Sequence, residues 1–183
     1  PERTGGSDLN GDGGLDYCVS DVGPPRCFFS DGQGGLVEVA GSSLGLSPGA
    51  LEAQPVGTIG WAVDFSDFNN DGYLDVVHAS GYDNSGTIPD GTLLPDLLWL
   101  GGEEGFVEAS QVVGLGSDAS RRGLLSADFD GDGALDVLAQ ADEAGGVAKL
   151  YMNRCGEGGW VAIELVGPPT NTMGIGARVR LNW

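Results

Sequence analysis

Three nine-residue segments each place four oxygen-bearing side chains at odd-numbered positions, a spacing suited to holding a divalent cation. In each, acidic or amide side chains occupy positions one, three, five and nine, and a glycine at position six lets the chain turn sharply. Oxygen ligands wrapped around such a turn form the cage that Ca²⁺ prefers. These acidic loops, called first, second and third below, are DLNGDGGLD (8–16), DFNNDGYLD (67–75) and DFDGDGALD (128–136).

We therefore expect Ca²⁺, about three ions in all, with position seven contributing its backbone carbonyl. Mg²⁺ demands tighter octahedral geometry, and no Cys or His stands at the ligand spacing of a zinc site. The candidate metal ligands are Asp8, Asn10, Asp12, Gly14 and Asp16 in the first loop, Asp67, Asn69, Asp71, Tyr73 and Asp75 in the second, and Asp128, Asp130, Asp132, Ala134 and Asp136 in the third.

An EF-hand shares this spacing over its first nine positions and is the main alternative. It needs a bidentate acid at position twelve and a helix on each side of the loop. Position twelve is instead Val19, His78 or Ala139, and the flanking residues have strand-like composition. Chelation is therefore expected to close at position nine, with the terminal Asp binding through both oxygens.

The acidic loops belong to a longer internal repeat, because their first residues lie 59 and 61 residues apart. Each loop leads into β-branched and aromatic runs at matching offsets, beginning with LDYCVSD, LDVVHAS and LDVLAQA. Four short runs per unit, separated by Gly, Pro, Asn and Asp, predict a four-stranded antiparallel sheet. A repeat of this length with four strands is typical of a β-propeller blade.

We predict an all-β chain of about three blades, the first incomplete because only PERTGGS precedes its loop. A C-terminal β-hairpin is expected where VAIELVG and IGARVRL flank a turn-rich segment, and its last strand could fill the gap in the first blade. Ordinary propellers need more blades, so we expect either a piece of a longer protein, which the start at Pro1 favours, or copies that associate to complete a ring. The expected divisions are approximately 1–46, 47–116 and 117–158 for the blades within 1–158, then 159–183 for the last blade strand and the segment after it.

The charge balance limits the choice of partners. The chain carries 27 acidic against 8 basic residues, a formal net charge of −19. Such a surface repels phosphate backbones, so we expect no nucleic-acid partner. No apolar run approaches the length needed to cross a membrane, so we expect no membrane span.

The loop pattern within this repeat resembles the FG-GAP/VCBS repeats of integrin-α-type propellers. The segment GWVAIELVGPPTNTMGIGARVRL resembles the opening of the ASPIC/UnbV module, which follows such repeats in cartilage acidic protein and its bacterial relatives. The resemblance implies a secreted or surface-bound protein with Ca²⁺ in its blade loops. Two features depart from it, since the repeats are too few for a seven-bladed ring and the ASPIC/UnbV part stops after its first hairpin.

Other chemistry-bearing residues have structural explanations. Cys18 and Cys27 occupy matching apolar positions on adjacent strands, so they form either a disulfide or two buried thiols, and Cys155 has no evident partner. His78 has no Ser or Cys motif beside it, which favours a structural role. Trp61, Trp99 and Trp160 are expected to pack between blades, although one of them could stack on a sugar.

The functional expectation is an extracellular calcium-binding scaffold or protein-interaction module without enzymatic activity. A lectin-like propeller that binds glycans is the second hypothesis, and calcium-dependent self-assembly of incomplete blades is another. An enzyme acting on polysaccharide ranks last, because no acid outside the metal loops is an evident catalytic candidate. The sequence does not identify the protein or glycan partner.

Overall fold

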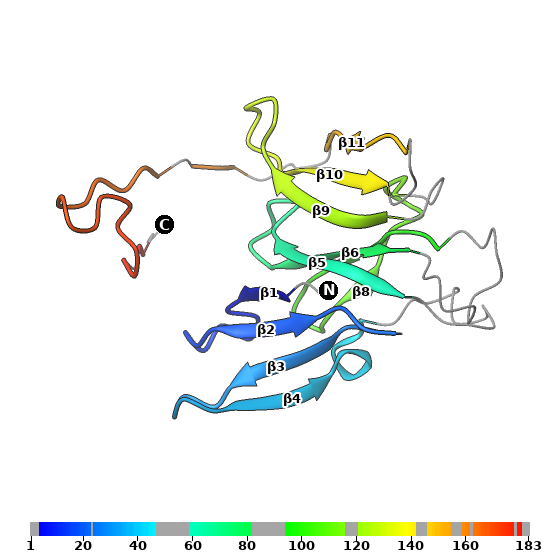
Figure 1. Cartoon of the computed structure of the whole chain (residues 1–183). Coiled ribbons are helices and arrows are strands. Elements are labelled where there is room, and N and C mark those ends of the chain that lie inside the picture. Colours follow the sequence, from blue (N-terminus) through cyan, green and yellow to red (C-terminus); the bar gives the residue numbers. More distant parts are fainter. Residues whose placement is uncertain are drawn as a thin grey trace.

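A computed structural model of the chain contains three antiparallel sheets stacked one on another (Figure 1). The structure describes residues 4–22, 24–46, 59–81, 94–115, 121–141, 146–154, 159–161, 163–177 and 179–180. The sheets are β1 (Thr4–Ser7), β2 (Asp16–Val19), β3 (Arg26–Ser30) and β4 (Leu36–Ala40); β5 (Gly60–Ser66), β6 (Asp75–Ser80), β7 (Leu97–Leu100) and β8 (Val107–Glu108); and β9 (Arg121–Ala127), β10 (Asp136–Ala141) and β11 (Lys149–Tyr151). A short 3-10 helix, η1 (Gly41–Leu44), follows β4.

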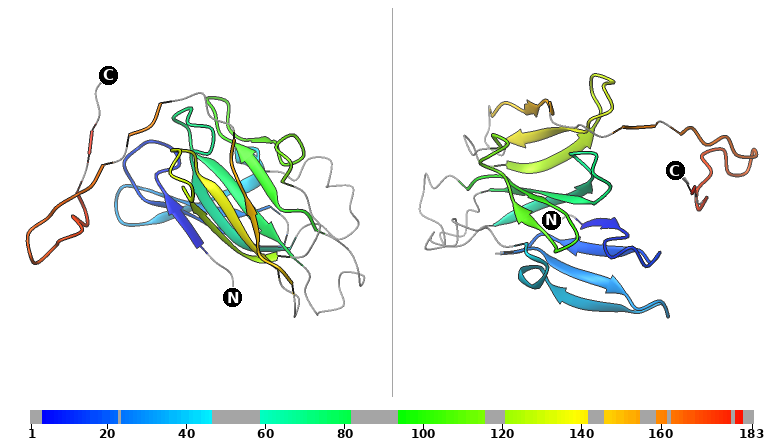
Figure 2. Two further views of the ribbon diagram at one scale, coloured as in Figure 1. Left: turned by 90° about the horizontal axis from the view of Figure 1, so that it is seen from above. Right: turned by 180° about the vertical axis from the view of Figure 1, so that it is seen from behind.

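Each sheet is an up-and-down meander in chain order, and an acidic loop joins its first two strands. The first strand of the middle sheet, β5, contacts both β1 and β9, so equivalent strands lie side by side (Figure 2). The three sheets are therefore arranged like successive blades of a β-propeller, which confirms the predicted fold class. We call them blades 1, 2 and 3.

The two larger hydrophobic clusters lie at the interfaces between blades, and a smaller one contains Ile59 and Leu94. Between blades 1 and 2, Cys18 and Cys27 pack with Val63, Phe65 and Trp99. The second interface lies between blades 2 and 3 and contains Phe68, Val77, Leu98, Leu115 and Val137. Every residue of β6 is buried, because blade 2 is covered on both faces. Its polar residues Asp75, His78 and Ser80 are therefore buried together with Val76, Val77 and Ala79.

The structure corrects the predicted completeness of the blades. Blade 1 has its leading strand, since Thr4–Ser7 pairs with β2 in a register that joins Ser7 to Asp16. The expectation that this strand is missing was wrong, as was the idea that a C-terminal strand replaces it. Its sequence TGGS has low strand propensity, and pairing with β2 determines its conformation instead. Among the described residues, blade 3 is the sheet with three strands.

The predicted C-terminal hairpin and fourth strand of blade 3 are not formed in the described part of 159–180. This segment extends away from the sheets (Figures 1 and 2). Its Gly167–Ala177 portion forms consecutive turns, in which the Asn171 side chain accepts from the Ile175 N–H at 2.9 Å. An isolated two-stranded hairpin is marginally stable, and here no sheet covers its apolar side chains.

The described residues contain no helix long and apolar enough to cross a membrane.

Candidate metal centre

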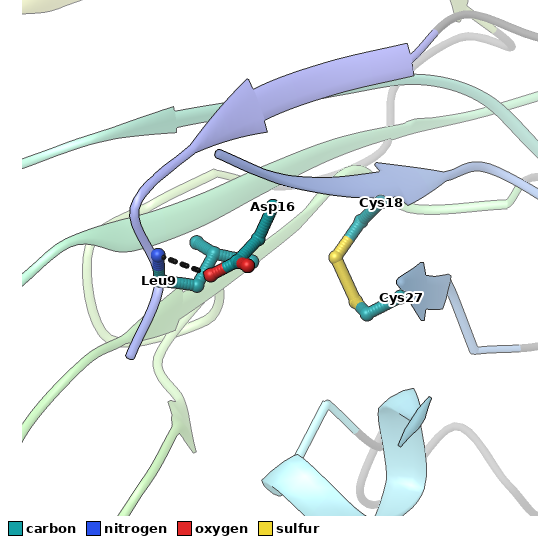
Figure 3. Close-up of a disulfide and its surroundings, with 4 residues drawn as sticks. All are labelled: Leu9, Asp16, Cys18 and Cys27. Atoms are coloured by element: carbon teal, nitrogen blue, oxygen red, sulfur yellow. Dashed lines mark hydrogen bonds between the residues drawn. A yellow bond between two sulfur atoms is a disulfide. The ribbon is translucent and has the colours of Figure 1, made fainter. Parts of the chain in front are cut away.

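The acid at position nine of each loop is buried and joins the loop to its blade. Asp16, Asp75 and Asp136 are at most 1% exposed. Each uses one carboxylate oxygen to accept the N–H of position two and the other to accept an N–H at the end of the blade's third strand. In the first loop the donors are Leu9 at 2.8 Å, drawn in Figure 3, and Ser30 at 2.9 Å. The corresponding donors are Phe68 and Gly101 for Asp75, and Phe129 and Asn153 for Asp136.

Positions one, three and five hold the loop backbone in successive turns. In the second loop, Asp67 accepts the N–H groups of Asp71 and Gly72, and Asp71 accepts that of Tyr73. The glycine at position six has a positive φ in every loop, as predicted, with 92° at Gly72. These bonds place the side-chain oxygens on the inner side of the turn. The same pattern of side-chain acceptors occurs in the first and third loops.

The third loop brings its carboxylates together most closely. One carboxylate oxygen from each of Asp128, Asp130 and Asp136 lies within 4.8 Å of the others. In the part of the chain that the structure describes, no other three Asp, Glu, His or Cys side chains meet in this way. Three expected ligands of one ion therefore converge in this loop.

The first and second loops differ at position three, which is Asn rather than Asp. The Asn10 amide donates to Asp12 at 2.9 Å, and the Asn69 amide donates to Asp71 at 2.8 Å. The side chains at positions three and five are thus hydrogen-bonded to each other. Each of these two loops also has fewer carboxylates than the third loop. In the third loop position three is Asp130, so this loop carries one carboxylate more than the other two, and Asp130 accepts the Asp132 N–H at 3.3 Å.

The electrostatics of the loops fit a bound cation. The pKa of Asp75 is raised to about 6, chiefly by burial and to a smaller extent by the charges of Asp71 and Asp67, against the lowering effect of two backbone hydrogen bonds. In the first loop Asp8 Oδ1 is buried and has no hydrogen-bond partner among the described residues. A buried carboxylate oxygen without a donor is costly, and a divalent cation would satisfy it. The residues present therefore fit Ca²⁺.

Position seven is also held by the loop. Gly14, Tyr73 and Ala134 each donate their N–H to the carboxylate at position five. The Tyr73 hydroxyl lies 3.4 Å from a carboxylate oxygen of Glu103, whose negative charge raises the tyrosine pKa. The Tyr73 side chain thus points toward the turn after β7, and only the backbone of Tyr73 takes part in the hydrogen bonds of the loop.

The cysteine pair predicted on adjacent strands is a disulfide. Cys18 and Cys27 are opposite each other in the β2–β3 register, and both are fully buried (Figure 3). The bond faces blade 2 and forms part of the core between the blades. Cys155 lies outside the described residues.

The three tryptophans are in different environments. Trp99 is fully buried between blades 1 and 2, which confirms its predicted packing role. Trp61 is partly buried and lies under the Arg122 guanidinium, whose carbon is 4.2 Å from the indole ring centroid. Trp160 is 55% exposed and lies against Gly133 of the third loop, where a β-carbon would overlap the indole. Trp160 is therefore the most exposed of the three and the best placed to contact a ligand.

His78 is fully buried in β6, as expected of a structural residue. Its Nδ1 lies 3.3 Å from the Ser80 hydroxyl, and a β-carbon on Gly60 would overlap its Nε2. Burial lowers the pKa of His78 from 6.5 to about 4. The ring is therefore neutral at pH 7 and inaccessible to a substrate.

Acidification is expected to destabilise the protein through His78. The unfolded chain binds this proton below about pH 6.5 and the folded chain only near pH 4, so the stability contribution is complete above 6.5 and is lost as the pH falls toward 4. The loss reaches about 3 kcal/mol at pH 4. Urea unfolding of the wild type and of His78→Gln, measured from pH 7 to 4, isolates this group, because the carboxylates titrate in both. Equal pH dependence in the two proteins would refute the assignment.

The fold and loops together define a β-propeller-like protein with acidic blade loops. Residues 8–78, from the first acidic loop into β6, match the family described as FG-GAP-like repeat. Repeats of this kind act as structural and interaction modules. No curated protein matches the chain.

The residues that connect one blade to the next were not predicted from the sequence. Asn153 donates to carbonyl groups of two loops, and Arg121 forms a buried ion pair with Asp96. Both lie outside the repeated motif. The signal for Arg121 was its rarity, since it is one of only 8 basic residues and stands in a strand.

Proposed function

We propose that this chain is an extracellular calcium-binding β-propeller segment that serves as a structural or protein-interaction module. The observation that carries the proposal is the convergence of Asp128, Asp130 and Asp136 within 4.8 Å. Hard oxygen donors without nitrogen or sulfur suit Ca²⁺ better than a transition metal. The match of residues 8–78 to an FG-GAP-like repeat supports the interaction role.

The proposal extends to the fifteen ligands of the three loops. The third loop is the strongest site, because its acids already lie together. The unpartnered Asp8 Oδ1 supports an ion in the first loop, and the raised pKa of Asp75 supports one in the second. Carbonyl groups at position seven would complete the coordination.

Calcium titration with and without chelator is the direct test. We expect about three ions to bind and the melting temperature to fall in excess chelator. At a free Ca²⁺ concentration ten times Kd, each site contributes about 1.4 kcal/mol to the unfolding free energy. The variant Asp130→Asn, which removes one acid of the third loop, should lower the number of bound ions by one. An unchanged melting temperature in chelator, or no calcium uptake, would refute the proposal.

The extracellular assignment rests on the Cys18–Cys27 disulfide, because such bonds persist in oxidising compartments. We also propose that residues 159–183 begin an ASPIC/UnbV-like segment. With a net charge of −19, the partner is a protein or a glycan rather than a nucleic acid. A second copy that completes the ring is one form of such a partner, which sedimentation in Ca²⁺ would detect.

Glycan binding is a second candidate function. A hollow of about 420 Å³ lies between the second acidic loop and Trp160, and its lining includes Asp67, Asp71 and Val161. An exposed indole beside polar loop groups is suited to stacking on a sugar ring. Glycan-array binding in Ca²⁺ that is lost in Trp160→Ala and retained in Trp160→Phe would support a lectin. Equal binding by the two variants would reject it.

A further inference from the structure

The second and third acidic loops are joined by a short hydrogen-bond relay through one side chain. The Asn153 N–H donates to Asp136 Oδ1 at 2.7 Å, and its amide Nδ2 donates to the Phe68 carbonyl at 2.6 Å. The Phe68 N–H in turn donates to Asp75 Oδ2 at 2.8 Å. The two buried acids at position nine are therefore connected through Phe68 and Asn153 alone.

Two more contacts strengthen the connection between these loops. The second hydrogen of the Asn153 amide donates to the Leu135 carbonyl of the third loop at 3.1 Å. Asn70 of the second loop donates to the Gly133 carbonyl of the third at 3.4 Å, a longer and weaker bond. The relay is also partly shielded from water, because Phe68 is 6% exposed and Asp136 is 1% exposed.

Within the described residues, blade 2 has no equivalent side chain that connects the first and second loops. The residue that donates its N–H to Asp75 Oδ1, as Asn153 does to Asp136, is Gly101. A β-carbon on Gly101 would overlap the Leu74 carbonyl, so the local backbone requires glycine there. The relay is thus specific to one pair of loops.

We propose that Asn153 is a positioning residue that couples calcium binding in the second and third loops. An ion that fixes Asp136 also fixes Asn153, Phe68 and Asp75, so the second ion meets a loop that is already ordered. Binding in one loop then raises the affinity of the other, and the first loop binds independently. This inference rests on the proposed calcium function.

Luminescence of Tb³⁺, a hard cation with calcium-like ligand preferences, reports ions bound near Trp160, and this signal comes from the third loop alone when the second loop is disabled. Trp160 lies against Gly133 and sensitises an ion bound there, and Trp160→Phe identifies that signal. Disabling the second loop with Asp67→Asn and Asp71→Asn should weaken Tb³⁺ binding in the third loop about five-fold or more. Disabling the first loop with Asp8→Asn and Asp12→Asn should leave it unchanged.

The decisive comparison repeats this experiment in the Asn153→Ala background, or in Asn153→Ser if the alanine variant does not fold. We expect the effect of disabling the second loop to disappear there. An undiminished effect, or an equal effect from the first loop, would overturn the coupling while leaving the calcium function intact. Absence of Tb³⁺ and Ca²⁺ binding in every loop would overturn both.

Hydrogen exchange measured without metal tests the hydrogen-bond relay independently of ion binding. In excess chelator, Asp136→Ala should speed hydrogen exchange of the Phe68 amide when Asn153 is present, and much less in the Asn153→Ala background. Equal acceleration in both backgrounds would contradict the relay, whatever the metal affinity.

Discussion

Replacing Asp75 with alanine is expected to lower the unfolding free energy by about 3–5 kcal/mol, even in excess chelator. The carboxylate is fully buried and accepts the N–H groups of Phe68 and Gly101, both at 2.8 Å. Hydrogen bonds to charged groups contribute about 1.5–3 kcal/mol each, and the substitution leaves two backbone donors without an acceptor. Urea unfolding monitored by circular dichroism measures the change.

The matched control is Asp71→Ala, which removes a proposed ligand of the same loop from an exposed position. In chelator this variant should lose at most about 1 kcal/mol, because its hydrogen bonds lie within the turn. With Ca²⁺ present, both variants should lose the stabilisation by the second ion. Equal destabilisation of the two variants in chelator would contradict the structural role of the acid at position nine.

This double role explains which part of the site could be predicted from the sequence. Alternating acids around a glycine indicate a chelating turn, since the side-chain types and the turn lie within nine residues. The hydrogen bonds of Asp75 to Gly101 span 26 residues, so their formation depends on strand pairing that no local pattern specifies. The sequence therefore indicated ligands at position nine and did not indicate their structural role.

Strands were predicted correctly where the side-chain pattern favours a sheet. The predictions failed where strand formation depends on pairing with a neighbouring strand. The core runs of β6 and β7 were predicted because β-branched and aromatic residues favour sheets. The TGGS of β1 has one such residue, Thr4, beside two glycines, and its pairing with β2 makes it a strand. Residues 175–180 alternate well, yet in the described part of that segment no neighbouring strand offers a ladder. An alternating side-chain pattern therefore predicts a strand correctly only when a neighbouring strand is available for pairing.

The contact between blades 2 and 3 is expected to depend on the buried pair of Arg121 and Asp96. Their charged atoms lie 2.8 Å apart, with side chains at most 2% exposed, and Asp96 also accepts the Ser80 N–H. Arg121 begins β9 of blade 3, whereas Asp96 directly precedes β7 of blade 2. Removing the arginine leaves a buried carboxylate without its cation. We therefore expect Arg121→Ala to cost about 3–5 kcal/mol of unfolding free energy.

Two comparisons within the chain test whether burial makes this pair important. The ion pair between Arg26 and Glu38 is equally short at 2.7 Å, but its side chains are about half exposed. Arg26→Ala should therefore cost at most about 1 kcal/mol. Replacing both buried partners, as Arg121→Met with Asp96→Leu, should restore most of the stability lost in Arg121→Ala, because no unpaired charge remains. If the double variant is less stable than Arg121→Ala, the pair itself, rather than the avoidance of a lone buried charge, holds blade 3 against blade 2.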